Sequence, residues 1–239
     1  MSSLTVNVDL SAVVRSIARQ NEPDPAQVAM LSEMYGANGV SVQFRRDRKY
    51  IRERDLYLLK GVVKSKLIIE LPPNEESIQK VTEIKPWMVM FAADHADSDS
   101  PLSPVDFNNA PIEYSSISNQ FSAIGVNVGY FIEPDSDEVK GAARAQASGV
   151  LINCSGYTKA RSMEDAQREL DRIDKAAQTA EKNNLTIYAG RGLNYKNIQP
   201  LVEIGLIDEF IIGHAIASRA MLVGYERAVT EMTALIRKS

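Results

Sequence analysis

The chain has 239 residues, 44% of them hydrophobic and 24% charged, enough to bury the core of one barrel or of two small domains. Its 27 basic and 31 acidic residues give a net charge of −4, which offers no general attraction to nucleic acid or to an anionic membrane. One cysteine, Cys154, excludes an internal disulfide framework, and two histidines provide no dense cluster of metal ligands. We therefore expect a cytoplasmic protein that binds a small molecule, with no metal and no membrane segment.

Short strand-like runs alternate with amphipathic stretches along the whole chain. In chain order, the expected strands are Leu4–Asp9, Gly39–Phe44, Lys66–Leu71, Trp87–Ala92, Val126–Ile132, Val150–Cys154, Leu185–Ala189 and Phe210–Gly213. The expected helices are Pro25–Tyr35, Glu53–Val63, Glu75–Ile84, Ile112–Ile124, Ser136–Ala147, Ser162–Asn183, Tyr195–Ile204 and His214–Arg237. Apolar residues recur in these stretches at helical spacing, as in Val28, Leu31 and Met34.

This alternation predicts a parallel sheet, and eight units in a chain of this length predict a closed (β/α)8 TIM barrel. We expect one domain over residues 1–239, because turn signals such as Leu71-Pro72-Pro73-Asn74 separate the units and no linker interrupts them. An open doubly wound sheet is the alternative. It is disfavoured because no Gly-x-Gly-x-x-Gly pattern follows the first strand.

Two glycine-bearing turns close the last two strands, Tyr188-Ala189-Gly190-Arg191-Gly192 and Ile211-Ile212-Gly213-His214-Ala215. The loops after strands seven and eight of such barrels commonly bind phosphate, because glycine lets backbone N–H groups approach the anion and a following helix adds its dipole. The turns therefore predict a phosphate site. After the fourth strand, residues 93–111 form the longest irregular stretch, which at this face of a barrel is typical of a lid.

Polar side chains at the predicted strand ends are the candidates for chemistry. Glu70 follows three apolar residues of its strand, where burial would raise its pKa toward that of a general base; a structural salt bridge to Arg45 or Arg191 is an equal alternative. Arg45 follows a strand end directly and could bind a phosphate, whereas Arg46, Arg48 and Lys49 are typical of a solvated face. His214 lies on the glycine turn and is expected to contact the ligand. Cys154 is expected to be a small buried hydrophobic residue, and His95 to be exposed.

In their order and spacing, several short segments resemble the pyridoxine 5′-phosphate synthase family from the first strand to the last helix. They are Val6-Asn7-Val8-Asp9, Pro23-Asp24-Pro25, Arg45-Arg46-Asp47-Arg48 with Ile51, Arg54-Asp55, Ile69-Glu70, Lys85-Pro86, Ala189-Gly190-Arg191-Gly192-Leu193, and Ile212-Gly213-His214-Ala215-Ile216 with Arg219-Ala220. The resemblance implies a TIM barrel with extra helices and an octameric assembly. It also implies condensation of 1-deoxyxylulose 5-phosphate with 3-amino-2-oxopropyl phosphate, with release of phosphate and water and without a cofactor.

The resemblance assigns roles to individual residues. Glu70 matches the family's catalytic glutamate, and Gln43 and Arg191 occupy positions where the family has histidines. The residues that match its ligand contacts are Asn7, Asp9, Arg45, Gly192, Gly213 and His214, with Ser100 in place of a threonine on the closing loop. Further departures are Leu10 and Tyr50 in place of histidines, Ile152 in place of a glutamate and Ala18 in place of an arginine.

These departures bear on proton transfer, because glutamine does not titrate and arginine stays protonated. Three hypotheses follow. The chain is a divergent synthase in which Glu70 is the main base, a paralogue that acts on another phosphorylated substrate, or a non-enzymatic binder of pyridoxine phosphates or subunit of a true synthase.

Overall fold

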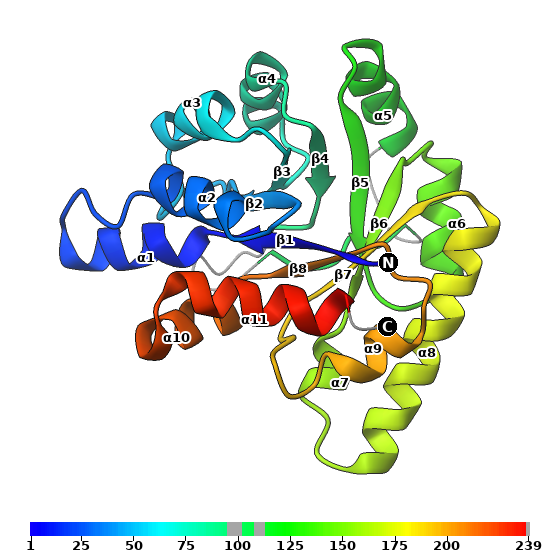
Figure 1. Ribbon diagram of the computed structural model, residues 1–239. Coiled ribbons are helices and arrows are strands. Elements are labelled where there is room, and N and C mark those ends of the chain that lie inside the picture. Colours follow the sequence, from blue (N-terminus) through cyan, green and yellow to red (C-terminus); the bar gives the residue numbers. More distant parts are fainter. Residues whose placement is uncertain (95–101, 108–112, 238–239) are drawn as a thin grey trace.

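Eight parallel strands close into a barrel in the order in which they occur in the chain (Figure 1). The computed structural model describes residues 1–94, 102–107 and 113–237. The strands are β1 (Ser3–Asn7), β2 (Gly39–Gln43), β3 (Lys66–Leu71), β4 (Met88–Phe91), β5 (Asn127–Ile132), β6 (Gly149–Asn153), β7 (Thr186–Gly190) and β8 (Glu209–Ile212). Because β8 pairs with β1, the sheet has no edge. The prediction of a (β/α)8 barrel is confirmed, and the open doubly wound sheet is wrong.

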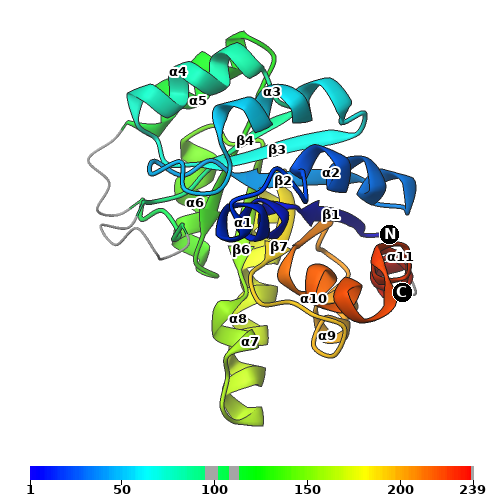
Figure 2. The same ribbon diagram turned by 90° about the vertical axis from the view of Figure 1, so that its left-hand side faces the viewer.

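Helices surround this barrel on the outside (Figures 1 and 2). They are α1 (Asp9–Ala18), α2 (Pro25–Met34), α3 (Glu53–Val62), α4 (Glu75–Ile84), α5 (Tyr114–Ala123), α6 (Ser136–Arg144), α7 (Ser155–Thr158), α8 (Met163–Lys182), α9 (Gln199–Glu203), α10 (His214–Val223) and α11 (Tyr225–Arg237). Among the described residues, no helix is long and apolar enough to cross a membrane.

Polar side chains at the expected turns start several of these helices. Asp24 accepts a hydrogen bond from the Ala26 N–H at 2.8 Å, and Asn74 accepts one from the Ser77 N–H at 2.9 Å. At the start of α8, the Ser162 hydroxyl accepts a hydrogen bond from the Asp165 N–H at 3.0 Å. Each side chain satisfies a backbone donor that the first turn of a helix leaves unpaired, so these residues fix where the helices begin.

Most boundaries lie within a few residues of those expected, and three differences matter for the architecture. The first strand ends at Asn7 instead of Asp9, because the Asn7 side chain accepts the Asp9 N–H at 3.2 Å and turns the chain into α1. The stretch 195–204 is helical only in α9. The predicted last helix is two helices, because Gly224 with a φ of +86° separates α10 from α11.

Alternation along the strands divides the core into two parts. Ile68, Met90, Leu151 and Tyr188 point into the barrel, whereas their neighbours along each strand pack against the helices. The N-terminal end of the barrel is closed by an ion pair between the buried Glu209 and Lys66, with 2.7 Å between Oε2 and Nζ. With apolar side chains inside the barrel and this ion pair at its N-terminal end, the C-terminal end is where polar groups can gather.

Figure 2 is drawn from the side on which α1 crosses in front of the strands. In Figure 1, β1 runs toward this side from the N-terminus, so the carboxyl ends of the parallel strands meet here. The short α7 and the beginning of α10 also follow strands at this end. The helices α1 and α7, together with the division of the last helix, correspond to the extra helices that the sequence resemblance implies.

Candidate active site

Glu70 lies at the centre of a hydrogen-bonded cluster in the top layer of the barrel. It is fully buried near the end of β3, and its Oε2 accepts a hydrogen bond from the Arg191 guanidinium at 2.6 Å. The same oxygen accepts a hydrogen bond from Gln43 Nε2 at 3.1 Å. Of the two alternatives from the sequence, the structure therefore contains the salt bridge, and its partner is Arg191 rather than Arg45.

Arg191 reaches Glu70 because of its backbone conformation. Arg191 has a φ of +79° and is followed by Gly192 with a φ of +77°, so the chain turns sharply after β7. A left-handed conformation is costly for a residue with a side chain, by about 1–2 kcal/mol. The turn places the guanidinium over the ring of Phe131, 4.3 Å from its centroid, and beside Glu70. The ion pair and the aromatic contact thus hold the side chain across the barrel mouth.

Asn7 and Asp9 form a second polar group at the end of β1. Asn7 Nδ2 donates to Asp9 Oδ2 at 2.9 Å, and the backbone N–H of Gln43 donates to Asp9 Oδ1, also at 2.9 Å. Burial disfavours the charged carboxylate and raises the pKa of Asp9 to about 7, although these two donors and the Arg191 charge act in the opposite direction. Asp9 is therefore a carboxyl group that changes its protonation near neutral pH.

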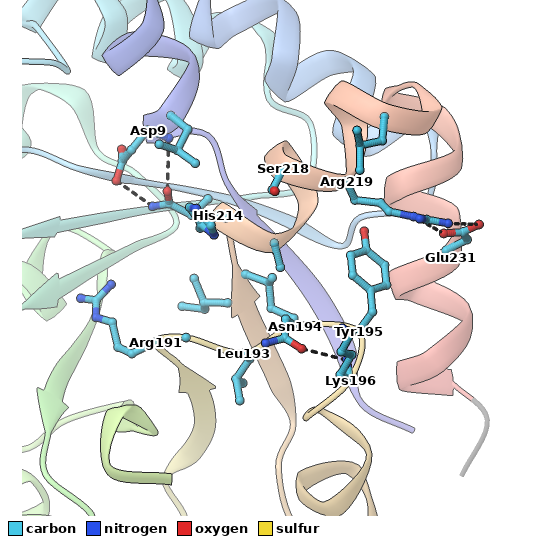
Figure 3. A pocket seen from close by; sticks show the side chains of 18 of the residues that line it. Asp9, Arg191, Leu193, Asn194, Tyr195, Lys196, His214, Ser218, Arg219 and Glu231 are labelled. Atoms are coloured by element: carbon cyan, nitrogen blue, oxygen red, sulfur yellow. Dashed lines mark hydrogen bonds and ion pairs between the residues drawn. The ribbon is translucent and has the colours of Figure 1, made fainter. Parts of the chain in front are cut away.

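A cavity of about 940 Å³ borders both groups (Figure 3). Figure 3 shows Asp9, Arg191 and His214 at one end of the cavity and the Arg219–Glu231 ion pair at the other. Its wall is formed by Asn7, Asp9, Leu10, Gln43, Arg191, Gly192, Leu193, Asn194, Tyr195, Lys196, Ile211, Ile212, Gly213, His214, Ala215, Ser218, Arg219, Leu222 and Glu231. Glu70 is not part of the wall and lies behind Gln43 and Arg191.

The glycine turns lie close to other parts of the chain. A Cβ atom on Gly213 would lie 2.9 Å from both the backbone oxygen and Oδ1 of Asn7, and one on Gly192 would collide with the Thr158 side chain. Only glycine fits at either position without displacing a neighbour. Gly213 precedes α10 directly, so free N–H groups of this helix start at the cavity, and the exposed His214 is its first residue. This arrangement suits an anion.

One predicted ligand contact lies elsewhere, and another lies outside the described residues. Arg45 does not border the cavity; its guanidinium forms an ion pair with Asp47 at 3.1 Å on the loop after β2. Ser100 lies outside the described residues, as do His95 and most of the proposed lid. In the basic segment after β2, Arg48 is not simply solvated, because its guanidinium stacks on Phe44, 3.7 Å from the ring centroid.

Sequence reasoning missed the far end of the cavity, where Tyr195 and Arg219 approach each other from different loops and helices. It also missed Phe131, whose only signal was its place near the end of the β5 apolar run.

Cys154 is fully buried, as expected, and burial raises the pKa of its thiol to about 12. Among the described residues, no group of three or more histidine, cysteine, aspartate or glutamate side chains could hold a metal ion.

Comparisons with known proteins identify relatives of this chain and similar folds. The chain is 39% identical over 239 residues to the pyridoxine 5′-phosphate synthase of Syntrophobacter fumaroxidans, and the alignment covers 99% of each chain. It is 36% identical to the enzyme of the same name from a Synechococcus strain, with 97% of each chain covered. The fold is similar to that of phosphoribosyl anthranilate isomerase from Thermus thermophilus, with a TM-score of 0.63 at 10% identity and coverage of 99% of this chain and 98% of the other. Residues 4–238 match the family described as pyridoxal phosphate biosynthesis protein PdxJ, and the chain therefore belongs to this family.

Proposed function

We propose that the protein is a pyridoxine 5′-phosphate synthase that condenses 1-deoxyxylulose 5-phosphate with 3-amino-2-oxopropyl phosphate and releases phosphate and water. The observation that supports this most strongly is the convergence of the matched residues. Asn7, Asp9, Gln43, Arg191 and the two glycine turns border one cavity at the barrel mouth, although they come from four different strand ends. The relatives with this name align over nearly the full chain.

In this proposal, the turns at Gly192 and Gly213 bind a substrate phosphate. The first residues of α10 border the cavity, and the helix dipole favours an anion there. His214 lies at the same turn and contacts the bound group. Contact of Arg45 and of Ser100 with a second substrate stays a prediction.

Glu70 is proposed as the buried base. Its Oε2 is held by Arg191 and Gln43, whereas its Oε1 is buried without a hydrogen-bond partner among the described residues. A buried acceptor without a donor is costly, so a substrate group that carries a proton has a favourable position against this oxygen. Arg191 and Gln43, which border the cavity, orient the carboxylate through its other oxygen, Oε2.

One observation favours the second candidate, a relative that acts on another phosphorylated substrate. The Arg191 guanidinium neutralises Glu70 at 2.6 Å and cannot give or take a proton itself near neutral pH. Arg191 keeps N–H donors that Glu70 does not use, and these suit a further acceptor group on a substrate. The two candidates therefore differ in whether Arg191 binds the substrate or only holds Glu70.

A cytoplasmic homo-oligomer is also proposed, with an octamer as the assembly that the family resemblance implies. Large apolar side chains are exposed on α1 and α10, namely Ile17, Met221 and Leu222, which are 76%, 77% and 81% exposed. Both helices lie on the same side of the molecule in Figures 1 and 2. Contact with another copy would remove this surface from water. Light scattering on the purified protein measures the assembly.

The test of function is growth of a vitamin B6 auxotroph that lacks its own pyridoxine 5′-phosphate synthase. The wild-type gene should restore growth, and Glu70→Gln should not, provided that both proteins accumulate equally. As a matched control, Glu181→Gln changes an exposed acid on α8 and should restore growth like the wild type. Failure of the wild-type protein, when it is soluble and abundant, would contradict the synthase and favour the second candidate.

A further inference from the structure

Asp9 and Glu70 are two carboxyl groups joined through one residue. The backbone N–H of Gln43 donates to Asp9 Oδ1 at 2.9 Å, and the side-chain Nε2 of Gln43 donates to Glu70 Oε2 at 3.1 Å. Gln43 ends β2, with β1 on one side of it and β3 on the other, so the sheet register fixes this bridge. The two acids therefore keep a constant relation to each other and to the barrel mouth.

Their surroundings differ in charge. Glu70 is paired with Arg191, whereas none of the ion pairs among the described residues involves Asp9. Within the part of the chain that the structure describes, the Asp9 side chain accepts hydrogen bonds only from neutral amides, those of Asn7 and Gln43. Two neighbouring acids in unequal surroundings are suited to different tasks: burial without a paired cation makes the Asp9 carboxyl group hold a proton more readily than a solvated one.

Their access to the cavity differs as well. Asp9 borders the cavity, whereas Glu70 lies behind Gln43 and Arg191. Each Asp9 oxygen uses one lone pair for its amide donor, which leaves a further lone pair for a proton. A ligand in the cavity can therefore reach the carboxyl group of Asp9 directly.

We propose that Asp9 is a catalytic acid and base of this site, which exchanges protons with the substrate in the cavity. This inference rests on the proposed function, because the proposed condensation removes water. The Asp9 carboxylate takes a proton from a substrate carbon or nitrogen, which keeps the electron pair. That electron pair forms a double bond to the neighbouring carbon as the C–O bond there breaks. The Asp9 carboxylic acid gives its proton to the departing hydroxyl group, which leaves as water, and Asp9 returns to its starting form.

Three other charged or titratable groups act on this exchange. The Glu70 charge, from β3, favours the protonated form of Asp9, and the Arg191 charge, from the turn after β7, favours the ionised form. His214, at the start of α10, borders the same cavity. With a pKa of about 7, Asp9 is matched to proton transfer at neutral pH, which typically contributes a factor of about 10²–10⁴ in rate.

The first measurement is kcat/KM for both substrates between pH 5 and 9. The wild type should show a bend near pH 7, because kcat/KM reports the ionisation of free-enzyme groups. Asp9→Asn should lose about 10²-fold or more, with no bend, and should still gain thermal stability from added inorganic phosphate. The control Asp171→Asn, an exposed acid on α8, should behave like the wild type. An Asp9→Asn enzyme within threefold of the wild type, or one with the same bend, would overturn the proposal.

The second measurement does not depend on turnover. Infrared difference spectra between pH 5.5 and 8.5 should show a protonated carboxyl band that disappears near pH 7 in the wild type and in Asp171→Asn, and that is absent from Asp9→Asn. If Asp9→Asn does not fold because its amide opposes that of Asn7, Asp9→Ser replaces it in both experiments. A wild type that forms no product refutes the proposed function, and the infrared band then tests Asp9 alone. If the wild type shows no such band, the proton exchange by Asp9 is overturned. A band that is present in the wild type and missing from the Asp9 variant supports the exchange.

Discussion

Removal of the Arg191 cation should destabilise the fold, because it leaves the Glu70 carboxylate buried without its counter-ion. Glu70 is 0% exposed and Arg191 is 19% exposed, so the pair is buried on the carboxylate side. Loss of one partner of a buried pair costs about 3–5 kcal/mol, and we expect the lower end, about 3 kcal/mol, because solvent reaches the guanidinium. Arg191→Met is the suitable change, since methionine keeps the apolar contact with Phe131 and the same left-handed backbone requirement.

A double-mutant cycle isolates this effect. Glu70→Gln should cost less than Arg191→Met, because it leaves a partly exposed cation instead of a buried anion. The double variant should recover about 2 kcal/mol relative to the sum of the two single changes, since the neutral amide that replaces the Glu70 carboxylate no longer needs a counter-ion.

Urea denaturation at pH 7 gives the four free energies of unfolding, and calorimetry gives the melting temperatures. For a chain of this length, a loss of about 3 kcal/mol lowers the melting temperature by roughly 6–12 °C. The reasoning fails if Arg191→Met loses less than about 1 kcal/mol, or if the two changes are additive. Either result would mean that Glu70 does not depend on Arg191 in the folded protein.

Three further predictions concern the glycine turn, Asp55 and Asp9. Gly213→Ala should abolish the stabilisation by inorganic phosphate, because the added Cβ would lie 2.9 Å from a backbone oxygen. The control Gly61→Ala, with open space around the added Cβ, should keep that stabilisation. Equal shifts of the melting temperature by phosphate in both variants would contradict this. Burial opposes the charge of Asp55, yet the hydrogen bonds and charge of Arg15 hold the pKa of this carboxyl group below its usual range. The pair therefore stabilises the fold at neutral pH, and this contribution should be lost as the pH falls below about 4. An Asp55→Asn variant whose stability depends on acid pH in the same way as that of the wild type would refute this. For Asp9 the pH dependence has the opposite sign, because folding raises its pKa from 3.8 to about 7. As the pH increases from 4 to 8, the free energy of unfolding of the wild type should fall by up to about 4 kcal/mol relative to that of Asp9→Asn. Parallel curves of stability against pH would count against the raised pKa.

The barrel could be predicted from the sequence because each strand and helix carries its own periodic pattern. The same holds for the Gly192 and Gly213 turns, since glycine after an apolar run is a local signal. The boundary between β1 and α1 could not be placed from periodicity, because one hydrogen bond from the Asp9 N–H to Asn7 decides it. The division at Gly224 had a local signal, because a glycine inside an apolar periodic stretch can mark the end of a helix.

The site depends on contacts between distant residues, and these are not encoded locally. The sequence offered both Arg45 and Arg191 as partners for Glu70, and only the closed barrel brings Arg191, 121 positions away, within 2.6 Å. Arg45 instead turns to Asp47, two residues along its own loop. The raised pKa of Asp9 likewise depends on its burial beside Asn7 and Gln43, at the ends of two strands, and near Glu70 and Arg191. Neither property follows from spacing.

The most direct test of the central claim is incubation of the purified protein with 1-deoxyxylulose 5-phosphate and 3-amino-2-oxopropyl phosphate, while product absorbance and phosphate release are followed together. We predict stoichiometric formation of pyridoxine 5′-phosphate and phosphate by the wild type, none by Glu70→Gln, and faster turnover by the Gln43→His/Arg191→His double variant. If the wild type and the double variant are both inert while phosphate still stabilises them against heat, the protein is not a pyridoxine 5′-phosphate synthase and its cavity serves another phosphorylated ligand.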